Sequence, residues 1–260
     1  MYLGVDEAGK GPVLGPMVAA AVLASPSSLP AGIDDSKRLT PERRESLDAA
    51  IRDADAVAVG IAFVDTGEID RPDTDMNTLT VSGQARAVRA ALADSIDGGL
   101  VGADRDEPVR VVADAGDTSE ERFARRLGEH ITAPADWPED GPASPADDRR
   151  GLDDGLDPAG GRALPGVDVE AAHGADEDDP LVGAASVVAK VARDARMDAI
   201  DATYPDYAAV GSGYPGDATT RAFLRDYVAD HGEVPDCARR SWSTCDDVLA
   251  AAEQSGLDDF

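Results

Sequence analysis

The first sixteen residues constrain the fold of this chain more than any other stretch. Residues 2–5 form a short apolar run, the acidic pair Asp6 and Glu7 follows, and a glycine-rich turn comes next. Residues 13–23 are again mostly apolar and predict a second strand. Because a charged side chain is rarely buried unless it is paired or binds a metal, an apolar strand that ends on two acids is poor material for a core. The stretch predicts either a carboxylate metal site beside a backbone clamp or an acidic hairpin turn.

The turn itself argues against a nucleotide-binding loop. Gly4, Gly9 and Lys10 fit the start of the pattern G-x-x-x-x-G-K, but Gly11 stands where that motif needs Ser or Thr. Two acids also occupy the positions where phosphates would lie. Gly9 and Gly11 instead allow backbone shapes that other residues resist, and they let a ligand approach main-chain N–H groups.

Two further apolar runs lead into acids. Residues 109–113 end on Asp114 and Asp117, and residues 167–169 precede a third acidic stretch that reaches Asp176. Ligands of open α/β sheets bind at strand ends, and hard carboxylate oxygens suit Mg²⁺ or Mn²⁺. The residues alone leave open whether these acids meet. The candidate ligands of a two-ion site are Asp6, Glu7, Asp114 and Asp176.

Hydrophobic spacing and capping residues predict the remaining elements. Thr40 with Pro41, Asp179 with Pro180, and Asp217 are expected to begin helices. A strand is expected at 56–64, and helices at 77–93, 119–130, 179–200, 218–229 and 245–253.

The domain organisation follows from composition. Pro, Gly, Asp and Ala dominate residues 133–165, which predicts a mobile acidic surface insertion. We expect a catalytic domain at 1–203 that contains this insertion, and a helical appendage at 204–260.

The charge balance indicates a folded protein from a high-salt cytoplasm. There are 52 acids against 24 bases, for a net charge of −28. At about 1 M salt the Debye length is about 3 Å, so self-repulsion is screened. Only three lysines occur, Lys10, Lys37 and Lys190, and each lies in a motif-like stretch.

The sequence contains no long apolar span and no charged-then-apolar leader, so we expect a cytoplasmic protein without a membrane segment. Cys237 and Cys245 lack metal-type spacing and are expected to be free thiols. The three histidines are scattered, which argues against a zinc centre.

Seven motifs in order make the chain resemble ribonuclease HII, the type 2 ribonuclease H, and above all its archaeal branch. They are residues 4–12 (GVDEAGKGP), 35–37 (DSK), 114–117 (DAGD), 173–176 (HGAD), 184–190 (AASVVAK), 211–215 (GSGYP) and 240–242 (RSW).

The resemblance implies an α/β, ribonuclease H-like fold, in which helices flank a mixed sheet and a small helical part follows. It implies an endonuclease that hydrolyses the RNA strand of RNA–DNA hybrids and cuts 5′ to ribonucleotides embedded in duplex DNA. A monomer is expected, although the sequence does not give the oligomeric state. It also implies Mg²⁺ or Mn²⁺ at four catalytic carboxylates, Asp6, Glu7, Asp114 and Asp176.

The resemblance assigns substrate contacts as well. The family's glycine–basic–glycine clamp, which senses the 2′-hydroxyl, matches Gly9, Lys10 and Gly11, and its junction tyrosine matches Tyr214. Many members have arginine where Lys10 stands, and lysine acts on a phosphate only as a point charge. Phosphate contacts are expected from Lys10, Lys37 and Lys190.

Other interpretations stay open. Lys190 and Asp194 could form a structural ion pair, and Arg193 and Trp242 are expected to be structural. A resolvase- or integrase-type nuclease would share the fold but ignore ribose. A non-catalytic acidic binding protein would not cut at all.

Overall fold

The computed structural model describes residues 1–33, 39–102, 107–132 and 164–258. Lys37 and nearly all of the predicted insertion at 133–165 lie outside the described residues.

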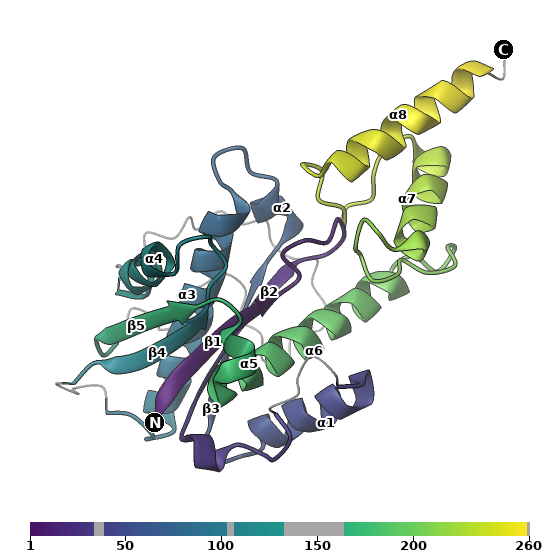
Figure 1. Cartoon of the computed structure of the whole chain (residues 1–260). Helices are drawn as coiled ribbons and strands as arrows, with labels where there is room; N and C mark the ends of the chain where they lie inside the picture. Colours follow the sequence, from purple (N-terminus) through teal and green to yellow (C-terminus); the bar gives the residue numbers. More distant parts are fainter. Residues whose placement is uncertain (34–38, 103–106, 133–163, 259–260) are drawn as a thin grey trace. The chain divides into compact units, whose positions relative to one another are not determined.

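A five-stranded mixed sheet is formed by strands between residues 2 and 172 (Figure 1). Its order is β3-β2-β1-β4-β5. Strand β1 pairs antiparallel with β2 and parallel with β4, and β4 pairs parallel with β5. The predicted mixed sheet is therefore confirmed. The strands are β1 Tyr2–Ala8, β2 Met17–Ala24, β3 Ala58–Val64, β4 Val109–Asp114 and β5 Val167–Ala172.

The helices begin where the capping residues predict. Thr40 accepts a hydrogen bond from the main chain of Arg43, and Asp179 and Asp217 cap their helices in the same way. The helices are η1 Pro26–Ser28, α1 Pro41–Arg52, α2 Thr66–Ile69, α3 Met76–Asp97, α4 Glu120–Thr132, α5 Ala175–Asp178, α6 Pro180–Ala202, α7 Ala218–His231 and α8 Ser243–Asp258.

The chain divides into two compact units. The sheet unit comprises Met1–Ala8, Val18–Phe63 and Met76–Val191. The clamp unit comprises Gly9–Met17, Val64–Asp75 and Ala192–Phe260, so it takes in the glycine turn as well as the C-terminal helices. The expected domains, 1–203 and 204–260, stay a prediction.

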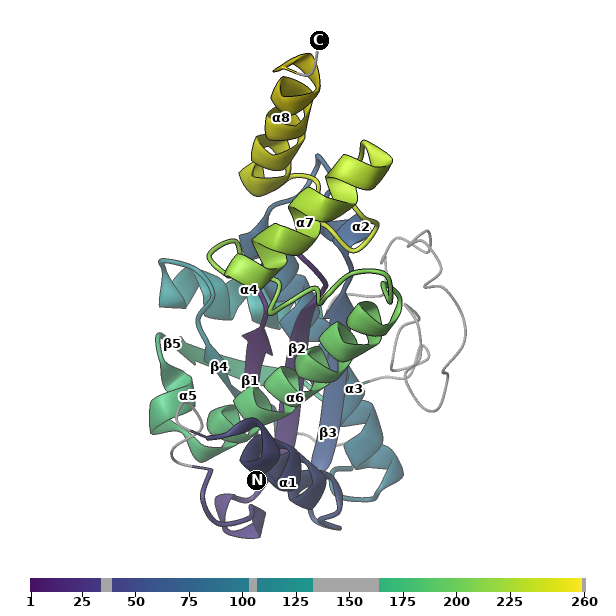
Figure 2. The same cartoon turned by 90° about the vertical axis from the view of Figure 1, so that its right-hand side faces the viewer.

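The sheet unit has three layers. Strand β2 is buried at every position, and its side chains alternate between the two faces. Ala19, Ala21 and Leu23 pack with residues of α3 and α4, whereas Ala20 and Val22 pack with α1 and α6. Figure 2 shows α1 and α6 in front of the sheet and α3 and α4 behind it. The flanking helices thus bury both faces of the strand that leads out of the glycine turn.

The clamp unit has a core of its own. Val13 and Leu14 pack with residues of α7 and of the segment before α8, and Leu14 forms an isolated bridge with Ala238. The rings of Tyr204, Tyr207, Phe223 and Tyr227 pack against one another. None of the helices in the described part of the chain combines the length and apolar character that a membrane span requires.

Gly4 allows α6 to approach β1. An added Cβ at this position would collide with the main chain of Leu181 and Val182 in the first turn of α6. We predict that Gly4→Ala lowers the free energy of unfolding by about 3 kcal/mol, because backbone atoms cannot rotate away as a flexible side chain can. Thermal unfolding in molar potassium chloride measures the change. The matched control is Gly216→Ala, since a Cβ there meets no atom within 4 Å. Equal stability of the two variants would contradict this packing.

Candidate active site

The carboxyl ends of three parallel strands bring the predicted acids of the sheet unit to one edge. Val5 pairs with Ala113, so Asp6 and Asp114 follow at neighbouring positions of β1 and β4. Asp114 in turn pairs with Ala172, the last residue of β5. Asp176 lies four residues further on, in the first turn of α5.

Hydrogen bonds fasten these strand ends together. The main-chain N–H of Ala175 donates to Asp114 Oδ1 at 2.9 Å, which holds the start of α5 against β4. Gln84 on α3 donates through Nε2 to Glu7 Oε2 at 2.7 Å and to the main-chain oxygen of Asp114 at 3.1 Å. Gln84 is fully buried, and its Oε1 has no partner among the described residues. Gln84 was not among the predicted site residues, although a polar residue within the apolar stripe of α3 is a signal that the sequence carries.

The environment of Asp6 opposes its negative charge. Its side chain is buried, with 5% of its surface exposed. Burial raises the pKa of Asp6 well above its ordinary value, and the charges of Glu7 and Asp114 raise it further. Hydrogen bonds with Ser186 and with the main-chain N–H of Glu7 oppose the rise.

This donor set fits a hard divalent cation. Several carboxylates crowd one strand edge, and one of them is buried beside like charges that a cation would offset. As they stand, no three carboxylate, imidazole or thiol groups of the described residues are gathered tightly enough to hold one ion. The complete ligand set of Asp6, Glu7, Asp114 and Asp176 therefore stays a prediction.

Lys190 reaches the same edge through a serine. Its Nζ donates to Ser186 Oγ at 2.8 Å, one turn earlier on α6, and Ser186 hydrogen-bonds with Asp6. Ser186 thus links the ammonium group of Lys190 to the buried carboxylate of Asp6.

The clamp unit brings the glycine turn and Tyr214 together. Gly9 has φ 88°, a left-handed conformation, and an added Cβ would collide with the side chain of Arg193. At Gly11 an added Cβ would lie 3.8 Å from Cε1 of Tyr214, so the turn runs beside the tyrosine ring. The Tyr214 side chain is 46% exposed. The structure requires glycine at position 9, whereas at position 11 it has room for a side chain.

Two buried arginines support this turn from inside the clamp unit. Arg193 donates to the main-chain oxygen of Ser212 at 3.2 Å, and its guanidinium lies 5.6 Å from the centre of the Tyr214 ring. Arg239 donates to three main-chain oxygens of the stretch from Gly9 to Gly15. Burial lowers the pKa of Arg193, and burial together with the Arg193 charge lowers that of Arg239 to about 9. Arg239 directly precedes the 240–242 motif, and no local sequence pattern predicts its bonds to the glycine turn.

Asp117, the other acid after β4, forms an ion pair with Arg122. Both of its carboxylate oxygens accept hydrogen bonds from Arg122, at 2.6 and 3.0 Å. The bond to Arg122 lowers the pKa of Asp117 to about 2. Asp117 is therefore held in an ion pair with Arg122, and the assignment of Asp114 as the ligand after β4 stays a prediction.

His173 tethers the loop that carries Asp176. Its Nδ1 lies 2.8 Å from Glu120 Oε1, and its Nε2 lies 2.8 Å from the main-chain oxygen of Asp117. Both neighbours are acceptors, so both ring nitrogens must carry protons to satisfy them. These contacts, first with Asp117 and then with Glu120, raise the pKa of His173 above its ordinary value of 6.5.

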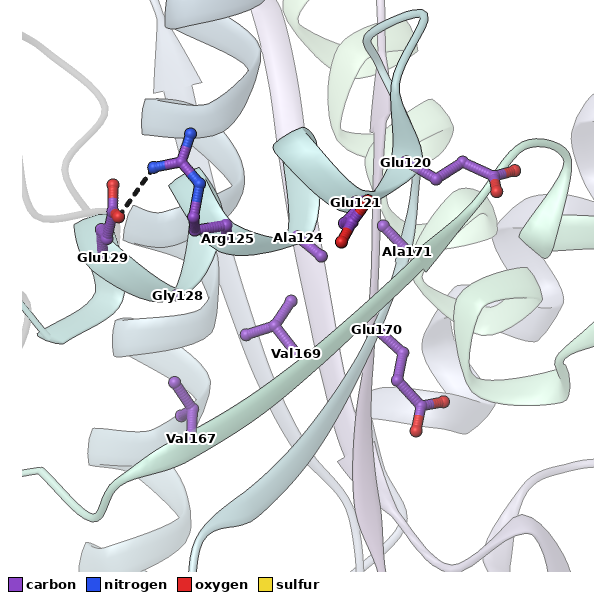
Figure 3. A pocket seen from close by; sticks show the side chains of 10 residues that line it. All are labelled: Glu120, Glu121, Ala124, Arg125, Gly128, Glu129, Val167, Val169, Glu170 and Ala171. Atoms are coloured by element: carbon purple, nitrogen blue, oxygen red, sulfur yellow. Dashed lines mark hydrogen bonds and ion pairs between the residues drawn. The ribbon is translucent and has the colours of Figure 1, made fainter.

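A pocket between α4 and β5 does not belong to this site. Figure 3 shows its lining, in which Arg125 pairs with Glu129 and the valines of β5 form the floor. Glu120, Glu121 and Glu170 add negative charge around it. None of the predicted site residues lines this pocket, and its acids would repel a polyanion.

We predict that His173 titrates above pH 6.5. Because the folded-state pKa is raised, the stabilisation that the charged His173 ring gives through its two hydrogen bonds is fully present below pH 6.5. It is lost as the pH rises through the folded-state pKa. An NMR titration of the ring measures the midpoint. Glu120→Gln should move it back toward 6.5, whereas Glu121→Gln, one residue further along the helix, should not. A wild-type midpoint at or below 6.5 would contradict the tether.

Comparison with known proteins identifies the family. The family model for ribonuclease HII matches residues 3–135 and 154–245. The chain is 50% identical to ribonuclease HII of Haloarcula marismortui over 260 residues, covering 100% of each protein. It is 46% identical to ribonuclease HII of Halobacterium salinarum strain R1, covering 99% of this chain and 98% of that one. These haloarchaeal relatives confirm the salt-adapted archaeal branch that the motifs and charge predict.

Solved structures agree with this placement. The ribonuclease H2 of Pyrococcus horikoshii OT3 superposes with a TM-score of 0.71 at 26% identity, covering 97% of this chain and 98% of that one. The ribonuclease HII of Archaeoglobus fulgidus, solved in a complex with PCNA, gives a TM-score of 0.69 at 29% identity and covers 100% of both chains. The Bst ribonuclease HIII complex with Mn²⁺ shares the fold, with a TM-score of 0.67 at 19% identity over 97% of this chain and 70% of that one. The chain therefore belongs to the ribonuclease HII family and is a ribonuclease H, an endonuclease for RNA–DNA hybrids.

Proposed function

We propose that this ribonuclease cuts 5′ to ribonucleotides embedded in duplex DNA, as well as within RNA–DNA hybrids, by two-metal-ion catalysis that leaves 5′-phosphate and 3′-hydroxyl ends. The observation that carries the proposal is the crowding of Asp6, Glu7 and Asp114, which raises the pKa of the buried Asp6. A bound cation would offset the repulsion between these carboxylates, and such crowding is typical of functional sites.

The carboxylates have defined tasks in this proposal. Asp6, Glu7, Asp114 and Asp176 would hold Mg²⁺ or Mn²⁺, and such ions supply an activated water and offset the charge that develops at phosphorus. Gln84 orients Glu7, and the N–H of Ala175 orients Asp114. Ser186 orients Asp6 and links it to Lys190. These contacts fix the rotamers of the ligands before a substrate arrives.

In this proposal the clamp unit distinguishes ribose from deoxyribose. The 2′-hydroxyl is the group that distinguishes RNA from DNA. Main-chain N–H groups at Lys10 and Gly11 can bind it, and the missing side chain at Gly11 leaves the space that a nucleotide needs. The exposed ring of Tyr214, beside Gly11, would pack on the neighbouring deoxyribose, where an additional hydroxyl would clash.

The cations would bind the phosphates that flank the cut. Lys10 lies in the glycine turn, and Lys190 donates a hydrogen bond to Ser186. We propose the same role for Lys37, which lies outside the described residues. We also propose that the protein acts as a monomer in the cytoplasm.

The decisive variant is Asp114→Asn. The substrate is a DNA duplex with one ribonucleotide, incubated with Mg²⁺ or Mn²⁺ in molar potassium chloride. We expect a single cut 5′ to the ribonucleotide in the wild type and a loss of roughly a hundredfold or more in the variant, because a charged ligand is removed. Asp117→Asn is the matched control, since Asp117 pairs with Arg122 and should leave the cleavage rate unchanged.

The substrates separate the alternatives. Equal cutting of an all-DNA duplex by the wild type would favour a resolvase-like nuclease. Absence of cutting with either metal at any salt concentration would favour a binding protein. Cleavage that survives Asp114→Asn but not Asp117→Asn would reverse the assignment of the two acids.

Tyr214 provides a separate test of the junction contact. We predict that Tyr214→Ala raises KM for the single-ribonucleotide duplex about tenfold, because the packing surface for the neighbouring sugar is lost. Tyr214→Phe keeps the ring and should stay within about twofold of the wild type. Steady-state kinetics measure both variants, and an unchanged KM in Tyr214→Ala would contradict the contact.

A further inference from the structure

Arg239 is a buried guanidinium without a carboxylate counter-ion. Its side chain is fully buried in the clamp unit, and none of the ion pairs among the described residues involves it. A buried charge without a counter-ion is costly unless hydrogen bonds satisfy it. Its bonds run from Nη2 to Gly9 O at 2.6 Å, from Nη1 to Lys10 O at 3.0 Å and from Nε to Gly15 O at 2.9 Å.

The two bonds to Gly9 and Lys10 fix the direction of the next N–H groups. In a planar trans peptide, the C=O of one residue and the N–H of the next point in opposite directions. No peptide bond in the described chain is cis. Because the oxygens of Gly9 and Lys10 point toward Arg239, the N–H groups of Lys10 and Gly11 point away from it.

The glycine turn reaches the surface of the clamp unit at Gly11. Gly11 is exposed, and the ring of Tyr214 lies next to it. Trp242 completes the inner support, since its indole N–H donates to Gly11 O at 3.3 Å and its ring lies 5.0 Å from the Arg239 guanidinium. The turn is therefore held from within through its carbonyl groups.

The charge of Arg239 has a second effect. A charged donor at a carbonyl oxygen polarises the whole peptide group, and the N–H of that group becomes a stronger donor. Arg239 thus orients and strengthens the same two N–H groups.

We propose that Arg239 is a positioning residue for ribose recognition: it draws the carbonyls of Gly9 and Lys10 inward and so aims the N–H groups of Lys10 and Gly11 at the 2′-hydroxyl at the cut site. This inference rests on the proposed function of the clamp. It extends that function to a residue more than two hundred positions away in the sequence.

The test compares two duplexes that differ by one 2′-hydroxyl. Binding of the single-ribonucleotide duplex and of the all-DNA duplex is measured with Ca²⁺ in place of Mg²⁺, and kcat and KM are measured with Mg²⁺. Arg239→Lys keeps a nitrogen donor but loses the planar fork that binds several carbonyl oxygens at once. We expect its preference for the ribonucleotide to fall about tenfold, as for one lost hydrogen bond, while its affinity for all-DNA duplex stays within about twofold.

Arg240→Lys is the matched control. Arg240 is the next residue, is exposed, and pairs only loosely with Asp236 at 3.7 Å. It should keep the full preference for the ribonucleotide. Circular dichroism shows that each variant is folded before it is assayed.

The outcomes separate this inference from the function on which it rests. A wild type that binds both duplexes equally would overturn the clamp itself. A wild type with a clear preference that Arg239→Lys retains would overturn only the role of Arg239. An equal loss of affinity for both duplexes in Arg239→Lys would also overturn it, since that result indicates a general structural role.

A measurement on the wild type covers the case in which Arg239→Lys does not fold. Hydrogen exchange of the Arg239 Nη protons, which donate to Gly9 and Lys10, is followed by NMR with each duplex bound. Coupling between two sites is reciprocal, so the ribonucleotide duplex should slow this exchange more than the all-DNA duplex does. Equal exchange rates would overturn the proposal.

Discussion

The buried carboxylate of Asp6 is the constraint on which the rest of the sheet unit depends. Its burial and the nearby charges of Glu7 and Asp114 raise its pKa, so the folded state carries an electrostatic penalty at neutral pH. For an acid with a raised pKa, stability falls as the pH rises from its ordinary value to the folded-state one. The surrounding layers must supply the compensating stability, and β2, buried at all its positions, is part of them.

The clamp unit buries positive charge, whereas the sheet unit buries negative charge. Two guanidiniums are buried there, and main-chain oxygens accept their hydrogen bonds. Arg239 makes three such bonds, whereas Nε of Arg193 is buried without a partner among the described residues. Neither arginine forms an ion pair among the described residues, although acids are abundant in a chain with a net charge of −28. These bonds hold the main chain of the glycine turn from inside the clamp unit.

Much of this could be predicted from sequence because the relevant signals are local. An apolar run that ends on acids, a capping residue before a periodic segment, and glycines in a turn each lie within a few residues of one another. The predicted starts of α1, α6 and α7 are confirmed, whereas α8 begins before its expected start and β5 continues past its expected end. Pairing of β5 with β4 extends that strand. The partners of Gln84 and Arg239 could not be assigned, because Glu7 and the glycine turn lie far from them in the sequence. The contact of Ser186 with Asp6 is equally distant.

The most direct test of this account is the stability of Asp6→Asn with and without Mn²⁺, measured by thermal unfolding in molar potassium chloride. If the buried charge is a penalty that a metal offsets, the variant is more stable than the wild type without metal, and Mn²⁺ stabilises the wild type alone. A variant that is less stable than the wild type and that gains as much from Mn²⁺ would contradict the account.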